Sequence, residues 1–151
     1  MKLARGCFFG AALLALAAGL VQAADVAIPA DIDGRWRVKD PDTQRDTAII
    51  EIHTRDGAGQ GRLDPFDTPP DARCKNCKGE LAGTFMHGLP LLQELHVEDG
   101  RWKGRILNPN TGRTYALELV SKDGQLHITA RALFGLFRHR ETWTLDTSLR
   151  Q

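Results

Sequence analysis

The residues best suited to chemistry in this sequence are two cysteines, Cys74 and Cys77, in the stretch CKNCKGEL. A C-x-x-C pair occurs in proteins as half of a zinc site, as a thiol–disulfide redox centre, or as a structural disulfide. Each of these needs different surroundings. The compartment of the protein and the segments around the pair therefore decide between them.

The first 23 residues indicate export from the cytoplasm. Lys2 and Arg5 precede an apolar run of about 15 residues, and small Ala23 follows it, which is the layout of a cleaved secretory signal. The run is shorter than the ~20 residues that a membrane-spanning helix needs. We therefore expect a signal peptide at residues 1–23, no membrane span, and a periplasmic or secreted protein.

The mature chain, residues 24–151, has the size of a single domain. Without Lys2 and Arg5 it carries 18 basic side chains against 19 acidic ones, a net charge of about −1, so nucleic acid is not an expected partner. Its two serines, Ser121 beside a turn and Ser148 in the tail, do not fit a serine hydrolase. We predict no enzymatic activity and no cofactor.

In an oxidising compartment Cys74 and Cys77 form the remaining even pair, because Cys7 leaves with the signal. A zinc site needs about four ligands, and the five histidines are scattered without ligand spacing, so no metal is expected. A thioredoxin-type centre needs a helix directly after the pair, and no amphipathic helix follows. A local disulfide is preferred, with redox activity and metal binding as alternatives. A loop this short contributes about 2 kcal/mol, enough to pin a loop.

Outside this loop the chain has the pattern of short strands separated by turns. Apolar and polar residues alternate in Gly34–Asp40 and in Asp46–His53. Further strands are predicted at 61–63, 80–86, 91–98, 101–107, 113–120, 125–133 and 140–146. Turns rich in Gly, Asn, Asp and Pro separate them. This spacing predicts an all-β fold, a small antiparallel up-and-down barrel of about eight strands.

The two ends of the chain indicate how such a barrel closes. Gly34-Arg35-Trp36 is a G-x-W in the first strand, and the last strand contains Arg138, Arg140 and Trp143. These positions resemble the lipocalin and calycin barrels, in which this tryptophan lies across the floor and a basic side chain of the last strand packs on its ring. The resemblance implies that Trp36 is buried against a cation, with Arg140 as first candidate. Alternation places Arg140 and Trp143 on opposite faces unless a bulge intervenes.

The chain also resembles, as a whole, the bacterial secreted proteins grouped as domain of unknown function 2147. The resemblance runs from GRW to ETWTL through CKNCKGEL, GLPLL, GRWKGRILNPNTGRTYALEL and FGLFRHRETW. It implies a single-domain barrel in the cell envelope and brings no established activity. Where the family tends to show D-P-x-x-G-K-x-Y, this chain has Asn108 in place of the aspartate, which removes a carboxylate from that turn.

One segment combines apolar and basic residues in a way that favours ligand binding. Four basic residues flank the apolar turn LFGLF at 133–137. An apolar tail could enter the barrel there while an anionic head meets the arginines. The basic residues are Arg131, Arg138, His139 and Arg140, and the predicted ligand-binding set is Arg131, Phe134, Phe137, Arg138 and Arg140.

We therefore expect a barrel that binds a small amphipathic or lipid-like ligand without enzymatic turnover. The alternative is an envelope protein whose barrel is filled by side chains and whose loops, pinned by the disulfide, contact a protein partner. The interior decides between the two, since eight strands either just fill with side chains or leave room for one small ligand.

Overall fold

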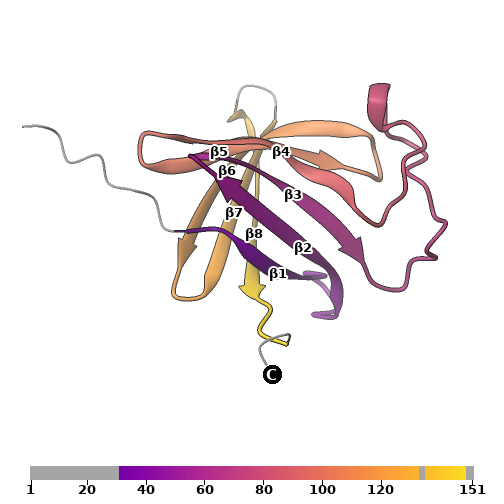
Figure 1. Ribbon diagram of the computed structural model, residues 1–151, viewed down its shortest axis with the longest axis horizontal. Coiled ribbons are helices and arrows are strands. Elements are labelled where there is room, and N and C mark those ends of the chain that lie inside the picture. Colours follow the sequence, from indigo (N-terminus) through magenta and orange to yellow (C-terminus); the bar gives the residue numbers. More distant parts are fainter. Residues whose placement is uncertain (1–30, 133–134, 149–151) are drawn as a thin grey trace, which may run out of the picture.

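The structure is a computed structural model that describes residues 31–132 and 135–148. The predicted signal peptide, residues 1–23, lies outside these residues. Eight antiparallel strands form a closed barrel in which each strand pairs with the next and β8 pairs with β1 (Figure 1). The strands are β1 (Gly34–Lys39), β2 (Asp46–Arg55), β3 (Ala58–Pro65), β4 (Leu89–Glu98), β5 (Arg101–Asn108), β6 (Arg113–Lys122), β7 (Gln125–Ala132) and β8 (Phe137–Leu145). The predicted all-β up-and-down barrel is confirmed.

Three hairpins at one end of the barrel use the same two-residue turn. Asp56-Gly57, Asp99-Gly100 and Asp123-Gly124 all have positive φ angles at both positions. That conformation is the type I′ turn, whose twist matches the flanking strands and which Asp-Gly favours. The opposite end of the barrel has longer connections, and we call it the mouth end. Its described connections are residues 40–45, 66–88 and 109–112, and β7 and β8 also join at this end.

The segment at 80–86 is not a strand, so that prediction is wrong. Gly79–Leu81 forms a short 3-10 helix, η1, and the strand-like pairing nearby is one isolated bridge between Arg73 and Phe85. The apolar residues Leu81 and Met86 are instead partly buried and pack against the core. Among the described residues, no helix is long and apolar enough to cross a membrane.

Strand β3 begins earlier than predicted, because its glycines belong to the strand rather than to a turn. A Cβ atom at Gly61 would lie 2.8 Å from the side chain of Leu92 on β4. Glycine at this position therefore allows Leu92, which is fully buried, to fill the space next to the backbone.

Side chains fill the barrel at the end that carries the type I′ turns. Trp36 is 2% exposed, and its indole Nε1 donates a hydrogen bond of 2.9 Å to the carbonyl oxygen of Ile32. The burial of Trp36 expected from the G-x-W is thus confirmed. The buried residues packed with it towards this end include Ile52, Leu95, Trp102, Leu119 and Leu126.

The predicted contact between Arg140 and Trp36 is wrong. In the register of β1 and β8, Trp36 lies opposite Leu145, whereas Arg140 lies opposite Thr129 of β7. Arg140 is also on the outer face, because it is an odd number of residues from inward-facing Trp143. Both the stagger of the strands and the alternation of the side chains separate the guanidinium from the indole.

The barrel closes at a short seam, which consists of two residue pairs between β1 and β8, Trp36 with Leu145 and Arg37 with Thr144. Arg37 links the seam to its surroundings through hydrogen bonds of 2.6 Å to Asp46 and of 2.6 Å to Asp146.

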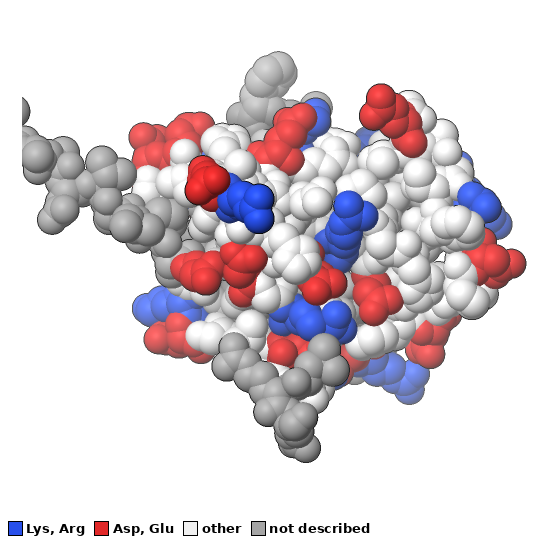
Figure 2. Space-filling view, in the orientation of Figure 1, with Lys and Arg blue, Asp and Glu red and all other residues white. Residues whose placement is uncertain are grey.

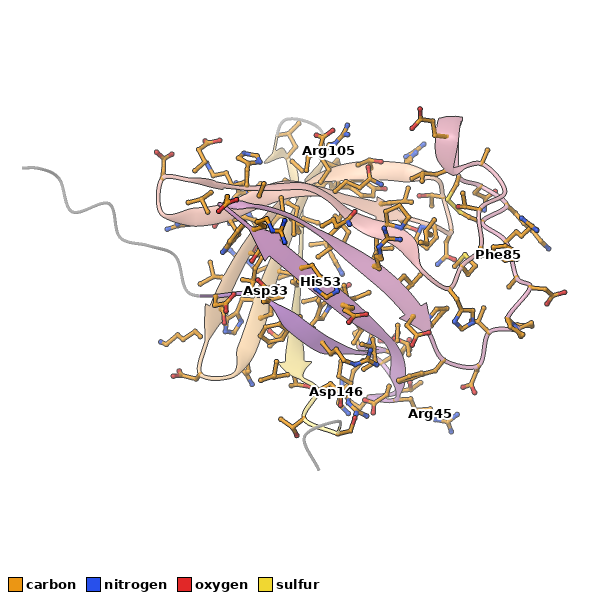
Figure 3. The ribbon with its side chains drawn as sticks, viewed as in Figure 1. Asp33, Arg45, His53, Phe85, Arg105 and Asp146 are labelled. Carbon is orange, nitrogen blue, oxygen red and sulfur yellow. A yellow bond between two sulfur atoms is a disulfide. The ribbon has the colours of Figure 1, made fainter. Side chains whose placement is uncertain are left out.

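Asp146 lies just past the end of β8 (Figure 3). It links β8 to β1, the two strands that meet at the seam. Its side chain is 3% exposed and contacts both Arg35 and Arg37 of β1. The hydrogen bond from Arg37, followed by those from Ser148, lowers the pKa of the Asp146 carboxyl from its ordinary 3.8 to about 2. This carboxylate therefore stays ionised in mild acid and holds the seam closed.

Candidate functional site

A cavity of about 720 Å³ opens at the mouth end of the barrel. Its wall is mainly apolar and includes Val38, Ile50, Leu63 and Ile106, and the buried indole of Trp143 also contributes to its lining. Small-molecule sites in proteins are commonly about 300–1,000 Å³ and mostly apolar, so this cavity has room for one small ligand. The barrel is therefore filled at one end and hollow at the other.

Small side chains create this space. Ala48, Ala130 and Ala132 all line the cavity, on β2 and β7. The filled end has tryptophan, leucine and isoleucine at the corresponding inward positions. The same strands run through both ends of the barrel, so the hollow arises from the smaller inward side chains at the mouth end.

The disulfide loop supports one side of the mouth. Cys74 and Cys77 are joined, as predicted, with their Cα atoms 5.4 Å apart, and both are buried. The sulfur of Cys74 lies 3.8 Å from the carbonyl oxygen of Pro109, and the side-chain amide of Asn76 donates a hydrogen bond of 2.6 Å to the carbonyl oxygen of Asn110. Pro109 and Asn110 line the cavity. The disulfide loop therefore fixes the β5–β6 turn that forms part of the rim.

A second contact ties the long β3–β4 connection to the barrel. The imidazole of His87 lies 2.9 Å from a carboxylate oxygen of Asp64 through Nδ1 and 3.1 Å from the carbonyl oxygen of Thr68 through Nε2. The hydrogen bond to Asp64 and then the one to Thr68 raise the pKa of His87 above its ordinary value. A protonated His87 holds this connection more firmly than a neutral one.

All three predicted ligand-binding arginines lie on the outer face of the barrel. On β7, Arg131 lies between inward-facing Ala130 and Ala132 and so points outward. On β8, Arg138 and Arg140 are each an odd number of residues from inward-facing Trp143 and also point outward. Arg131 and Arg138 border the cavity at its rim. Their role in binding stays a prediction, and the register limits it to a ligand group that protrudes from the mouth.

The predicted aromatic residues lie at the rim, as far as the structure describes them. Phe137 lines the cavity and is 64% exposed, and neighbouring Leu136 is 83% exposed. Phe134 lies outside the described residues. An exposed apolar patch, Leu136 and Phe137, therefore borders the apolar cavity at its rim.

Two inward-facing polar residues lie on β8. His139 and Glu141 line the cavity, and they share the face of Trp143. One carboxylate oxygen of Glu141 accepts a hydrogen bond of 2.9 Å from the indole Nε1 of Trp143, and the other lies 2.7 Å from Nε2 of His139. Sequence reasoning placed His139 in the basic rim and missed Glu141, although alternation from Trp143 identifies both as inward-facing.

The described residues hold no cluster of three or more His, Cys, Asp or Glu side chains that could bind a metal ion. On the face shown in Figure 2, acidic and basic side chains are interspersed rather than gathered by sign. The chemistry of the site therefore rests on the apolar cavity, its rim, and the polar group on β8.

An eight-stranded up-and-down barrel with a cavity at one end defines the lipocalin-like class of fold. A solved structure agrees: protein HP1028 from the human pathogen Helicobacter pylori, which is described as belonging to the lipocalin family, is similar to this chain with a TM-score of 0.65 and 17% sequence identity. The similarity covers 80% of this chain and 86% of that one. At this identity the comparison establishes the fold alone.

Residues 34–145 match the family described as uncharacterized protein conserved in bacteria (DUF2147). The chain belongs to this family, as the motifs in its sequence indicated. No curated protein sequence matches the chain.

Proposed function

We propose that this protein is located in the periplasm and that its barrel binds a small amphipathic or lipid-like ligand without enzymatic turnover. The observation that carries the proposal is the apolar cavity of about 720 Å³ at the mouth end. A barrel that served only as a scaffold would gain stability from filling this space, because empty apolar volume destabilises a core. A ligand that fills it recovers the lost contacts.

We infer the amphipathic character of the ligand from the polarity of the cavity wall, which changes from the interior to the rim. The interior is apolar, whereas the rim carries Arg138 and Asn110, and His139 and Glu141 face in from β8. Apolar contact supplies affinity, and the few polar groups orient the ligand.

The test is to fill the cavity and measure binding of a neutral fluorescent probe, N-phenyl-1-naphthylamine. Ala130→Trp places an indole in the cavity, and we expect it to weaken probe binding at least tenfold. The matched control is Ala116→Trp on the outer face of β6, which should bind as the wild type does. Should Ala130→Trp prevent folding, Ala132→Trp at the end of β7 makes the same test nearer the rim.

Absence of probe binding to wild-type protein, or equal binding by the inward and outward tryptophan variants, would contradict the proposal. Native mass spectrometry of protein purified from the periplasm should show a copurified small molecule. The location has its own test, since a processed N-terminus at Ala24 in the periplasmic fraction is the expected result. A protein that retains Met1 in the cytoplasmic fraction would contradict it.

A further inference from the structure

The head group that the cavity recognises can be inferred from the charge that faces into it. The ionisable residues that line the cavity, besides Tyr115, are Arg131, Arg138, His139 and Glu141. The two arginines extend from the outer face, and Arg131 also pairs with Glu118 at 3.4 Å. His139 and Glu141 are the two whose side chains extend inward.

Glu141 is held in place by the core. Its side chain is 35% exposed, and Trp143, which donates to it, is 2% exposed and fixed by packing. The carboxylate is thus anchored through one oxygen, while His139, at 67% exposure, contacts the other oxygen from the rim side. An ionised carboxylate has about four acceptor positions, and these two contacts use two of them.

We propose that the cavity selects ligands with a hydrogen-bond-donating head, a hydroxyl or an ammonium group, over ligands with a carboxylate head. A donor completes the free acceptor positions of Glu141 inside a mainly apolar cavity, where hydrogen bonds to a charged group are strong. A carboxylate head finds a like charge there, and the arginines that could pair with it extend from the outer face of the barrel, so it loses hydration on entering the cavity. This reverses the preference that an arginine-lined mouth would give.

The inference rests on the proposed function, because it requires that a ligand occupy the cavity. The experiment uses the full mature protein and three ligands of equal chain length, decylamine, decanol and decanoate, in competition with N-phenyl-1-naphthylamine at pH 7.5. The charged ligands are kept below their micelle concentrations, and decanol is kept below its solubility limit. We expect decylamine and decanol each to displace the probe at a concentration at least tenfold lower than decanoate.

The variant Glu141→Gln removes the negative charge but keeps an acceptor for Trp143. It should reduce the preference for decylamine over decanoate about tenfold, with a smaller effect on decanol. Glu98→Gln, an exposed carboxylate paired with Lys103 on the outer face, is the matched control for net charge and should leave the order unchanged.

Equal or tighter displacement by decanoate in the wild type overturns the proposal, and so does an unchanged preference in a folded Glu141→Gln variant. The wild-type series decides the question without the variant if Glu141→Gln does not fold. Failure of the probe itself to bind counts against the proposed function, whereas probe binding with no head-group preference counts against this inference alone.

Discussion

Trp36 offers the most direct test of how the barrel is filled. Its ring is 2% exposed, and its Nε1 supplies a hydrogen bond to the carbonyl oxygen of Ile32, which is itself fully buried. Truncation of a core tryptophan to alanine costs about 3–5 kcal/mol. Of this, the hydrogen bond accounts for about 1 kcal/mol. Trp36→Phe keeps most of the ring and should therefore cost about 1–2 kcal/mol.

These free energies convert into melting temperatures that calorimetry can resolve. For a domain of about 120 residues, 1 kcal/mol corresponds to about 4 °C, so Trp36→Ala should lower Tm by about 12–20 °C and Trp36→Phe by about 4–8 °C. Val120→Ala, on the outer face of β6, is the control and should change stability by less than ~0.5 kcal/mol.

The measurement is urea denaturation followed by circular dichroism, together with scanning calorimetry. A loss of less than ~1 kcal/mol in Trp36→Ala would refute the role of the ring as the core of the filled end. Equal losses in the phenylalanine and alanine variants would show that the hydrogen bond to Ile32 carries the effect instead of the ring.

Three further predictions concern the seam, the β3–β4 connection and the disulfide. Because the pKa of Asp146 is lowered from 3.8 to about 2, its ionised carboxylate stabilises the fold fully above pH 3.8, and this stabilisation is lost as the pH falls through about 2. In urea denaturation, Asp146→Asn should be less stable than wild type at about pH 6, and the difference should shrink towards zero as the pH falls below about 2. A constant difference at all pH values would contradict this. Because the pKa of His87 is raised, the stability that its protonated ring gives to the β3–β4 connection is fully present below the ordinary pKa of 6.5 and is lost as the pH rises through the higher folded pKa. Hydrogen exchange in residues 66–88, corrected for intrinsic rates, should therefore become faster with rising pH in the wild type but not in His87→Gln. Replacing Cys74 and Cys77 with serine should cost about 2–3 kcal/mol and leave the barrel folded, and abundant free thiol in protein isolated from its native cells would contradict a structural disulfide.

Local rules predicted most of the barrel. The alternation in β2, where Ala48, Ile50 and Ile52 belong to the core cluster, indicates the inward face from the strand's own residues. The Asp-Gly pairs specify tight hairpins through backbone preference alone. These signals are contained within about ten residues, so one sequence is enough to detect them.

The failures involve relations between distant segments. Alternation in 80–86 does not tell whether apolar residues such as Leu81 belong to a strand or to a non-strand segment that packs against the core. The distance between Arg140 and Trp36 depends on the stagger of the closed barrel, which local patterns do not contain. By contrast, Glu141 was predictable, because it lies two residues from Trp143 and so shares its face.

The size of the cavity could be foreseen only in part. Small inward residues such as Ala130 and Ala132 are visible once the strands are placed. Whether neighbouring side chains lean in to fill the gap depends on packing across the barrel, between strands that are distant in sequence. The hollow is therefore a property of the closed barrel and not of any one strand.

The short seam between β1 and β8 has a consequence for the order in which the chain folds. Every other pairing joins strands that follow one another, whereas the seam joins Trp36 to Leu145 across nearly the whole domain. Closing so long a loop costs chain entropy, and the hydrogen bonds of two residue pairs offset only a small part of that cost. We expect a curled, open sheet to form first and the seam to close last. The same step is the first to reverse, so the lowest-energy partly unfolded state exposes the free edges of β1 and β8, which can pair with another chain.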